Sequence, residues 1–193
     1  MKKQARDFGA ATGFRTLVPD LYRGELGVNA EEAHHLMDNL DWQGAVADIA
    51  AAAKYLKDTG CPTVAVMGFC MGGALSLAAG VHSADIDKVV CFYGTPPDAL
   101  ADVTTISKPV QAHFGDEDSH AGFSDPAAVA ALREKLEASG ADFTIHTYAG
   151  AGHGFMNDTE FFQNLGKELG RPEFSKEVYD TAFARVVDFV KAE

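Results

Sequence analysis

The sequence has few cysteines, and their spacing excludes two common structural roles. Only three occur among 193 residues, Cys61, Cys70 and Cys91, and no two of them form a CxxC pair. An odd number without such a pair fits neither a disulfide framework nor a structural zinc site. We therefore expect reduced thiols, of which at most one has a special role.

Basic residues and long apolar runs are also scarce. The 16 lysines and arginines face 28 acidic residues, and the resulting formal charge of -12 repels phosphate backbones and anionic lipids. No run approaches the roughly 18 apolar residues of a membrane span, and residues 1–14 lack the apolar core of a secretory signal. These absences argue against nucleic-acid and membrane partners and predict a cytoplasmic protein.

The length and the 47% hydrophobic content predict a single domain over residues 1–193. Strand-like and helix-like patterns alternate along it, which is typical of an α/β layered fold with a mainly parallel sheet. The expected strands are residues 14–18, 63–67, 87–94, 109–115 and 142–148. The expected helices are one between Asp41 and Gly60, residues 74–82 and 126–139, and a final one after Ser175. The polar stretch 21–39 is predicted to be a long loop.

The segment GFCMGG, residues 68–73, follows an apolar strand and precedes a helix. It matches the nucleophile-elbow pattern, with Cys70 in the place of the nucleophile and small glycines where the helix must pack closely. A thiolate at a helix N-terminus is stabilised by free N–H groups, and the N–H of Met71 is placed to bind an oxyanion. The alternative is a buried cysteine that only helps the strand and the helix to pack.

A cysteine nucleophile needs a base, and the sequence offers seven histidines. His153 alone combines a loop position directly after a strand late in the chain with a glycine on each side. The others lie in a polar loop, at a helix end, within strands or beside acidic residues: His34, His35, His82, His113, His146 and His120. His153 is therefore the predicted base.

A carboxylate should orient that histidine. Asp116, Glu117 and Asp118 follow the strand 109–115, at the end of a parallel sheet where sites collect. An acidic cluster in a loop is usually only solvated. Here, however, the order of nucleophile, acid and histidine is that of the α/β hydrolases, which favours one of the three as the acid.

Five segments together resemble the dienelactone hydrolase family of α/β hydrolases: PDLYRG (19–24), GFCMGG (68–73), CFYG (91–94), HFGDED (113–118) and GAGHGF (150–155). The resemblance implies a three-layer α/β-hydrolase sandwich and a triad of Cys70, Asp118 and His153, with Asp116 as the second choice of acid. It implies no metal and no organic cofactor. It also implies a small ester or lactone substrate, as for a carboxymethylenebutenolidase.

The chain departs from this family pattern at its N-terminus. Family members carry several dozen more residues there, which form three strands and the loop with the second oxyanion donor. The sheet edge that this shortening would expose must pair differently or be covered by another chain, such as a second copy in a homodimer. Losing an oxyanion donor costs about 2.7–4 kcal/mol of transition-state stabilisation. The competing hypothesis is therefore a weak or inactive relative that binds a small molecule or a partner chain.

The predicted substrate contacts are Arg23, Phe69 and Phe155. Family members that act on dienelactone have an arginine shortly after the catalytic histidine. In this sequence the corresponding residues, 155–158, include no arginine. Arg23 is the remaining candidate for an anion contact, and an ordinary solvated arginine is the alternative.

Overall fold

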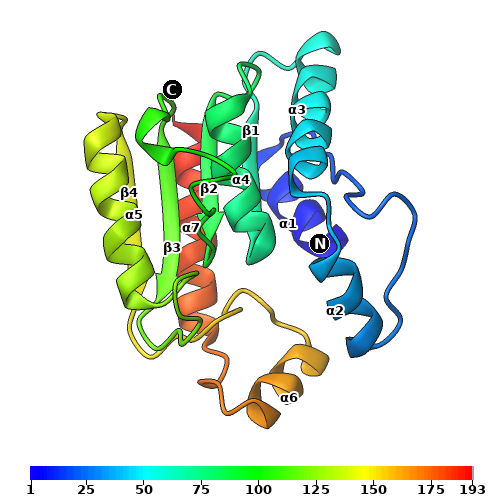
Figure 1. The fold of residues 1–193 in the computed structure, drawn as a ribbon, viewed down its shortest axis with the longest axis vertical. Helices are drawn as coiled ribbons and strands as arrows, with labels where there is room; N and C mark the ends of the chain where they lie inside the picture. The colour runs from blue at the N-terminus through cyan, green and yellow to red at the C-terminus, as the bar shows by residue number, and fades with distance from the viewer. Residues whose placement is uncertain (193) are drawn as a thin grey trace.

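The computed structural model describes residues 1–192, apart from the side chain of Ala30 (Figure 1). Its helices and strands alternate over most of the chain, as expected from the sequence. In chain order they are α1 (Lys2–Thr12), α2 (Ala30–Asp38), α3 (Trp42–Asp58), β1 (Ala65–Phe69), α4 (Met71–His82), β2 (Lys88–Phe92), η1 (Val103–Thr105), β3 (Val110–Gly115), α5 (Pro126–Ser139), β4 (Phe143–Tyr148), α6 (Glu160–Glu168) and α7 (Lys176–Lys191).

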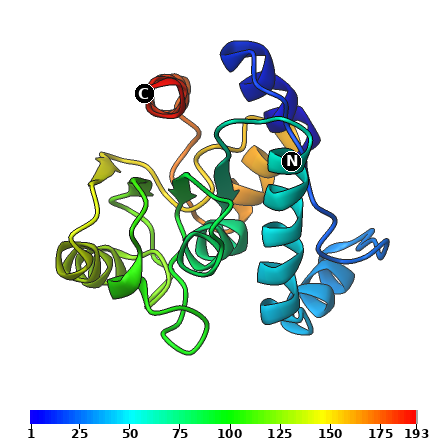
Figure 2. The same cartoon turned by 90° about the horizontal axis from the view of Figure 1, so that it is seen from above.

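The four strands form one parallel sheet in the order β1-β2-β3-β4. Viewed from above, α4 and α5 lie on one side of the sheet and α7 on the other, with α3 beside α4 and α1 beside α7 (Figure 2). Phe8 of α1 stacks on Phe183 of α7 with the ring centroids 4.2 Å apart. The predicted three-layer α/β architecture is therefore confirmed.

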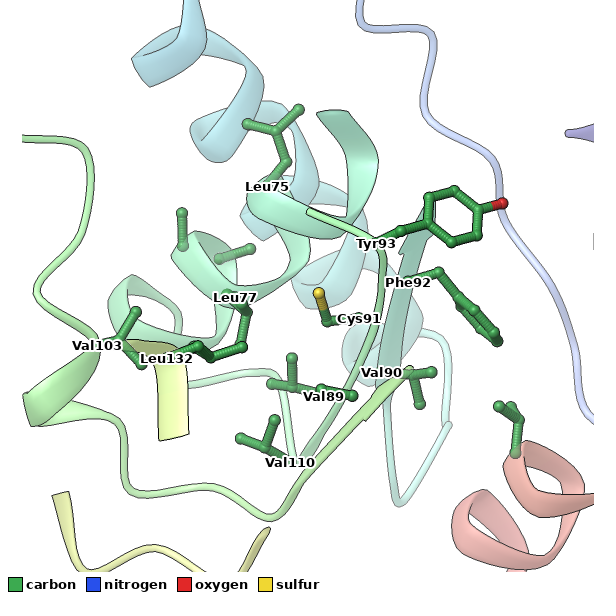
Figure 3. Close-up of a cluster of buried hydrophobic side chains, with 14 of the residues drawn as sticks. Leu75, Leu77, Val89, Val90, Cys91, Phe92, Tyr93, Val103, Val110 and Leu132 are labelled. Carbon is green, nitrogen blue, oxygen red and sulfur yellow. The ribbon is translucent and has the colours of Figure 1, made fainter. Parts of the chain in front are cut away.

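The core lies on both faces of β2, which explains the unbroken apolar run in that strand. Val89 and Cys91 point to the side of α4, whereas Val90 and Phe92 point to the opposite side, toward α7 (Figure 3). All four side chains are fully buried. Helix α4 approaches the sheet so closely that a Cβ at Gly73 would lie 2.3 Å from the backbone oxygen of Phe92, so this position requires glycine.

Helix ends follow the capping signals of the sequence. The side chains of Asp41, Asp125 and Ser175 accept hydrogen bonds from N–H groups in the first turns of α3, α5 and α7. Gly140 ends α5 with a left-handed φ of 70°. These three predicted helices are confirmed, and so are the strands β2, β3 and β4.

The predicted strand at residues 14–18 is wrong. This segment has no regular structure, and the side chains of Phe14, Leu17 and Val18 are 47%, 38% and 46% exposed. A short apolar run becomes a strand only when a sheet edge offers it hydrogen-bonding partners, and no other described strand pairs with β1 on its outer side. The homodimer expected from the sequence would use this edge and stays a prediction.

The predicted loop at residues 21–39 contains α2, which the sequence reading missed. The Asn29 side chain accepts from the N–H of Glu32 at 2.9 Å, and the Glu32 carboxylate accepts from the N–H of Val28. This pattern resembles a capping box, and the Asn-x-x-Glu spacing was the available signal. Helix α6 was also missed. Among the described helices, none combines the length and the hydropathy needed to cross a bilayer.

Candidate active site

The predicted nucleophile, Cys70, lies at the turn between β1 and α4. Its φ of 55° and ψ of -123° are unusual for a residue with a side chain, and its N–H donates to the Phe92 oxygen at 3.0 Å. A Cβ at Gly68 would lie 1.7 Å from the Gly72 oxygen, so the tight turn depends on glycine. These constraints hold the thiol at the carboxyl end of the sheet.

His153 reaches this thiol from the loop after β4. Its Nε2 lies 3.1 Å from Cys70 Sγ. The same loop bonds to the acidic loop after β3, because the N–H of Glu117 donates to Ala151 and the N–H of Asp116 donates to Tyr148. Two loops that are distant in the sequence are thereby fixed side by side.

Asp118 binds the other nitrogen of the same ring. Its Oδ2 lies 2.9 Å from His153 Nδ1, and its Oδ1 accepts from the N–H of His120 at 3.1 Å. Asp118 is buried, with 3% exposure. Asp116 is exposed and accepts instead from the N–H of Gly150 at 2.8 Å. The structure thus brings Cys70, His153 and Asp118 into one hydrogen-bonded line and leaves Asp116 outside it.

The charges in this line favour an ion pair. Burial raises the pKa of the Cys70 thiol, but the hydrogen bond and charge of His153, together with the Met71 N–H and Arg171, outweigh it and lower that pKa overall. Burial likewise opposes protonation of His153, whereas its bonds to Asp118 and Cys70 raise its pKa to about 9. Burial raises the pKa of Asp118, and the His153 bond lowers it overall. Both shifts favour a thiolate beside an imidazolium over a neutral pair.

This ion pair predicts the pH dependence of thiol labelling. In the wild type, iodoacetamide should alkylate Cys70 faster at pH 7 than an ordinary thiol, because the pKa of the Cys70 thiol is lowered. In His153→Gln the thiol keeps its burial but loses its partner, so labelling at pH 7 should slow by at least about tenfold, since one pKa unit changes the thiolate fraction about tenfold. The alkylation is carried out in the presence of a chelator, and peptide mapping then gives the alkylation rate of each cysteine. Equal rates in both proteins would contradict the ion pair.

Several residues at this site were not predicted individually. Tyr93, in the CFYG segment, is fully buried and meets the His153 ring edge-on at a centroid distance of 5.0 Å. Ser124 Oγ lies 3.1 Å from His153 Nδ1. Tyr22, in the PDLYRG segment, donates to Met71 Sδ at 3.8 Å. Tyr93 and Tyr22 belong to segments that the sequence analysis had singled out, but those segments did not indicate which side chains the two tyrosines contact.

The three residues predicted to contact the substrate differ in their burial and in their neighbours. Phe69 is half-buried and stacks on Phe92 at 4.8 Å, and Phe155 is buried beneath the site against Tyr93. The Arg23 guanidinium is largely exposed and pairs with Asp48 at 3.3 Å. The substrate roles of all three stay predictions.

A pocket opens beside His153, between its loop and the α6–α7 segment. Its lining includes Phe155, Phe162, Arg171 and Pro172. Arg171 is half-buried, and its positive charge contributes to the lowered pKa values of Cys70 and His120. Among the described residues, no side chain or backbone oxygen accepts a hydrogen bond from its guanidinium. No sequence signal pointed to Arg171, because it lies in a segment without an expected role.

The fold and the elbow place the chain among the α/β hydrolases. A dienelactone hydrolase-like promiscuous phosphotriesterase from metagenomic libraries superposes with a TM-score of 0.74 and 20% identity, over 97% of this chain and 78% of that one. The sequence profile of the Dienelactone hydrolase family matches residues 2–193. The chain belongs to the dienelactone hydrolase family, as the sequence resemblance predicted.

Two curated relatives show how far the similarity extends. Protein usf of Aquifex pyrophilus is 31% identical over 165 residues, which cover 81% of this chain and 69% of that protein. The carboxymethylenebutenolidase of Pseudomonas putida is 26% identical over 155 residues, which cover 74% of this chain and 64% of that enzyme. The chain spans between about half and about two thirds of the length of the curated relatives it matches.

Proposed function

We propose that this protein hydrolyses a small ester or lactone through a covalent intermediate on Cys70. One observation carries the proposal: a single imidazole joins a thiol at 3.1 Å to a buried carboxylate at 2.9 Å. This is the arrangement of nucleophile, base and orienting acid that acyl transfer requires. The membership of the dienelactone hydrolase family supports the same reaction class.

In the first half of the reaction, the Cys70 thiolate attacks the carbonyl carbon and the carbonyl electrons move to oxygen. The N–H of Met71, at the first position of α4, is placed to stabilise this oxyanion. When the tetrahedral intermediate collapses, the bond to the alcohol breaks and His153 Nε2 gives its proton to the leaving oxygen. The products of this half are an alcohol and a thioester on Cys70.

In the second half, His153 acts as the base. Its Nε2 takes a proton from water while the oxygen attacks the thioester, and the acid product leaves as the thiolate forms again. Asp118 holds the proton on Nδ1 throughout, so that once Nε2 has given up its own proton it presents a free lone pair to the water. One water is consumed for each ester.

The competing proposal is a binding protein that uses the same pocket but turns over slowly. The two are distinguished by mixing the purified chain with p-nitrophenyl acetate and recording both p-nitrophenol release and intact mass. The enzyme should give a burst of about one equivalent and a transient mass increase of one acetyl group on Cys70. No acyl adduct and no release above that of buffer would support the binder.

We also propose Arg171 as the residue that receives a carboxylate on the substrate. Its guanidinium is half-buried beside His153, and its positive charge acts on the Cys70 thiol. A fork of N–H donors without an acidic partner is suited to bind a carboxylate in two hydrogen bonds. Arg23, in contrast, is already paired with Asp48.

The corresponding prediction compares two arginine variants. Arg171→Gln should lower kcat/KM for an ester bearing a free carboxylate, such as mono-p-nitrophenyl succinate, by about 10- to 100-fold, because a charged hydrogen bond contributes about 1.5–3 kcal/mol. The same variant should leave p-nitrophenyl acetate nearly unchanged. Arg23→Gln is the matched control and should not discriminate between the two esters. The reverse result would assign the anion contact to Arg23.

A further inference from the structure

Two members of the candidate triad and a neighbouring histidine together form a group of side chains that could ligate a metal ion. Asp118, His120 and His153 each offer a ligand atom, and these atoms all lie within 4.8 Å of one another. His120 Nδ1 lies 3.3 Å from Asp118 Oδ1, and His153 Nδ1 lies 2.9 Å from Asp118 Oδ2. The mechanism above uses only two of these three residues, so the position of His120 is not explained by it.

We propose that Asp118, His120 and His153 form a site for Zn²⁺, which acts as an inhibitor and not as a cofactor. Two imidazoles, one carboxylate and an open fourth position make up a common ligand set for this ion. Ligand atoms about 2.0–2.1 Å from a tetrahedral Zn²⁺ lie about 3.3–3.4 Å from one another. The distance of 3.3 Å between His120 Nδ1 and Asp118 Oδ1 matches this spacing, whereas His153 Nδ1 and Asp118 Oδ2, hydrogen-bonded at 2.9 Å, would have to move slightly apart to bind the ion.

Of the three side chains, His120 is the most exposed to solvent. The side chains of Asp118 and His153 are buried, with 0% and 8% exposure, whereas that of His120 is 43% exposed. The rings of His120 and His153 lie 4.1 Å apart with a tilt of 30°. Zinc binding at the carboxylate would require this exposed ring to turn a nitrogen toward the ion. Ser124 Oγ, which also contacts His153 Nδ1, is a neutral hydroxyl and a weak zinc ligand.

Zinc at this position would stop the proposed reaction by fixing the wrong tautomer. The ion would take the lone pair of His153 Nδ1, and the proton held there by Asp118 would pass to solvent. The only proton left on the ring would then lie on Nε2, which faces Cys70 Sγ. A protonated Nε2 cannot accept a proton from water, so the thioester would not be hydrolysed. This consequence rests on the proposed function, whereas zinc binding itself does not.

The test measures zinc binding directly on the full chain. Isothermal titration calorimetry with zinc chloride should show one site in the wild type. His120→Gln should weaken binding by at least about tenfold, since even the loss of an outer partner of a ligand costs 10- to 100-fold. Cys70→Ala should bind as the wild type does, because the thiol lies at the opposite nitrogen. His34→Gln, on exposed α2, is the control histidine variant, and Mg²⁺ is the control ion.

Three other binding results would overturn the proposal. Loss of binding in Cys70→Ala with retention in His120→Gln would place zinc between the thiolate and Nε2. Equal binding by all variants would show adventitious zinc only, and no binding by the wild type would remove the site. A cobalt-loaded wild type should lack a thiolate-to-metal charge-transfer band, which gives a readout that does not depend on variants. Thermal melts should show that His120→Gln is folded. Zinc binding without any esterase activity would support the site and contradict only the proposed function.

Discussion

Replacing Cys70 by alanine should lower kcat/KM for p-nitrophenyl acetate by at least about 1000-fold, because in a triad that acts as a unit the nucleophile carries most of the acceleration. The variant keeps the fold, since the side chain of Cys70 fills little of the core and the turn is held by its backbone N–H to the Phe92 oxygen. It should also form no acyl adduct in an intact-mass measurement. The loss of activity and the absence of an adduct are both expected because the variant lacks the sulfur that would attack the ester.

Cys61→Ala is the matched control for this prediction. Cys61 lies in the loop before β1, where its sulfur contacts Arg15 at 3.4 Å, and it has no contact with His153. The control should retain wild-type kcat/KM. Retained activity in Cys70→Ala would instead mean that the nucleophile is another group. An intermediate test is Cys70→Ser, which should also be slow, because an alcohol is far harder to deprotonate than the thiol that forms an ion pair here.

The second large effect is expected for Asp118→Asn, with a loss of about 10,000-fold in kcat, comparable to the known effect of this change in a serine protease triad. An amide in this position can donate its NH₂ to His153 Nδ1, which moves the ring proton to Nε2. The nitrogen that faces Cys70 at 3.1 Å could then no longer accept a proton. The loss should therefore appear in kcat more than in KM.

Asp116→Asn is the corresponding control. Its carboxylate accepts only from the N–H of Gly150, and an amide oxygen can still accept that bond. Its kcat should stay within about threefold of the wild type, since surface changes of this kind alter little. A large loss in Asp116→Asn with little loss in Asp118→Asn would reverse the assignment of the acid.

Much of the sheet and of the site could be predicted because the signals are local. A strand, a glycine-rich turn and a helix in direct succession already place Cys70, and the glycines around His153 mark its loop. The sequence around Asp116 and Asp118 does not by itself indicate which of the two carboxylates contacts His153. This contact depends on how the chain turns after β3, where the N–H of Asp116 bonds to Tyr148 and the carboxylate of Asp118 turns inward.

The failures of prediction have a common physical cause. Residues 14–18 have the apolar composition of a strand, but hydrogen-bonding partners in a neighbouring strand decide whether such a segment becomes one. Arg171 lies beside His153 because of the way the long segment between β4 and α7 folds. No pattern in the sequence around Arg171 indicates this position. The structure of residues 14–18 and the position of Arg171 both depend on contacts between segments that are distant in the sequence. The hydrophobic periodicity of a short stretch of sequence does not indicate such contacts.

The groups that react in the proposed mechanism and most of the pocket wall belong to different parts of the chain. Cys70 is anchored to β2, and the two loops that carry Asp118 and His153 are bonded to each other. The pocket wall, in contrast, comes largely from residues 159–175, which supply Phe162, Arg171 and Pro172. Grafting this one segment from a relative should therefore transfer preference for a new acid or alcohol while the reacting atoms keep their spacing.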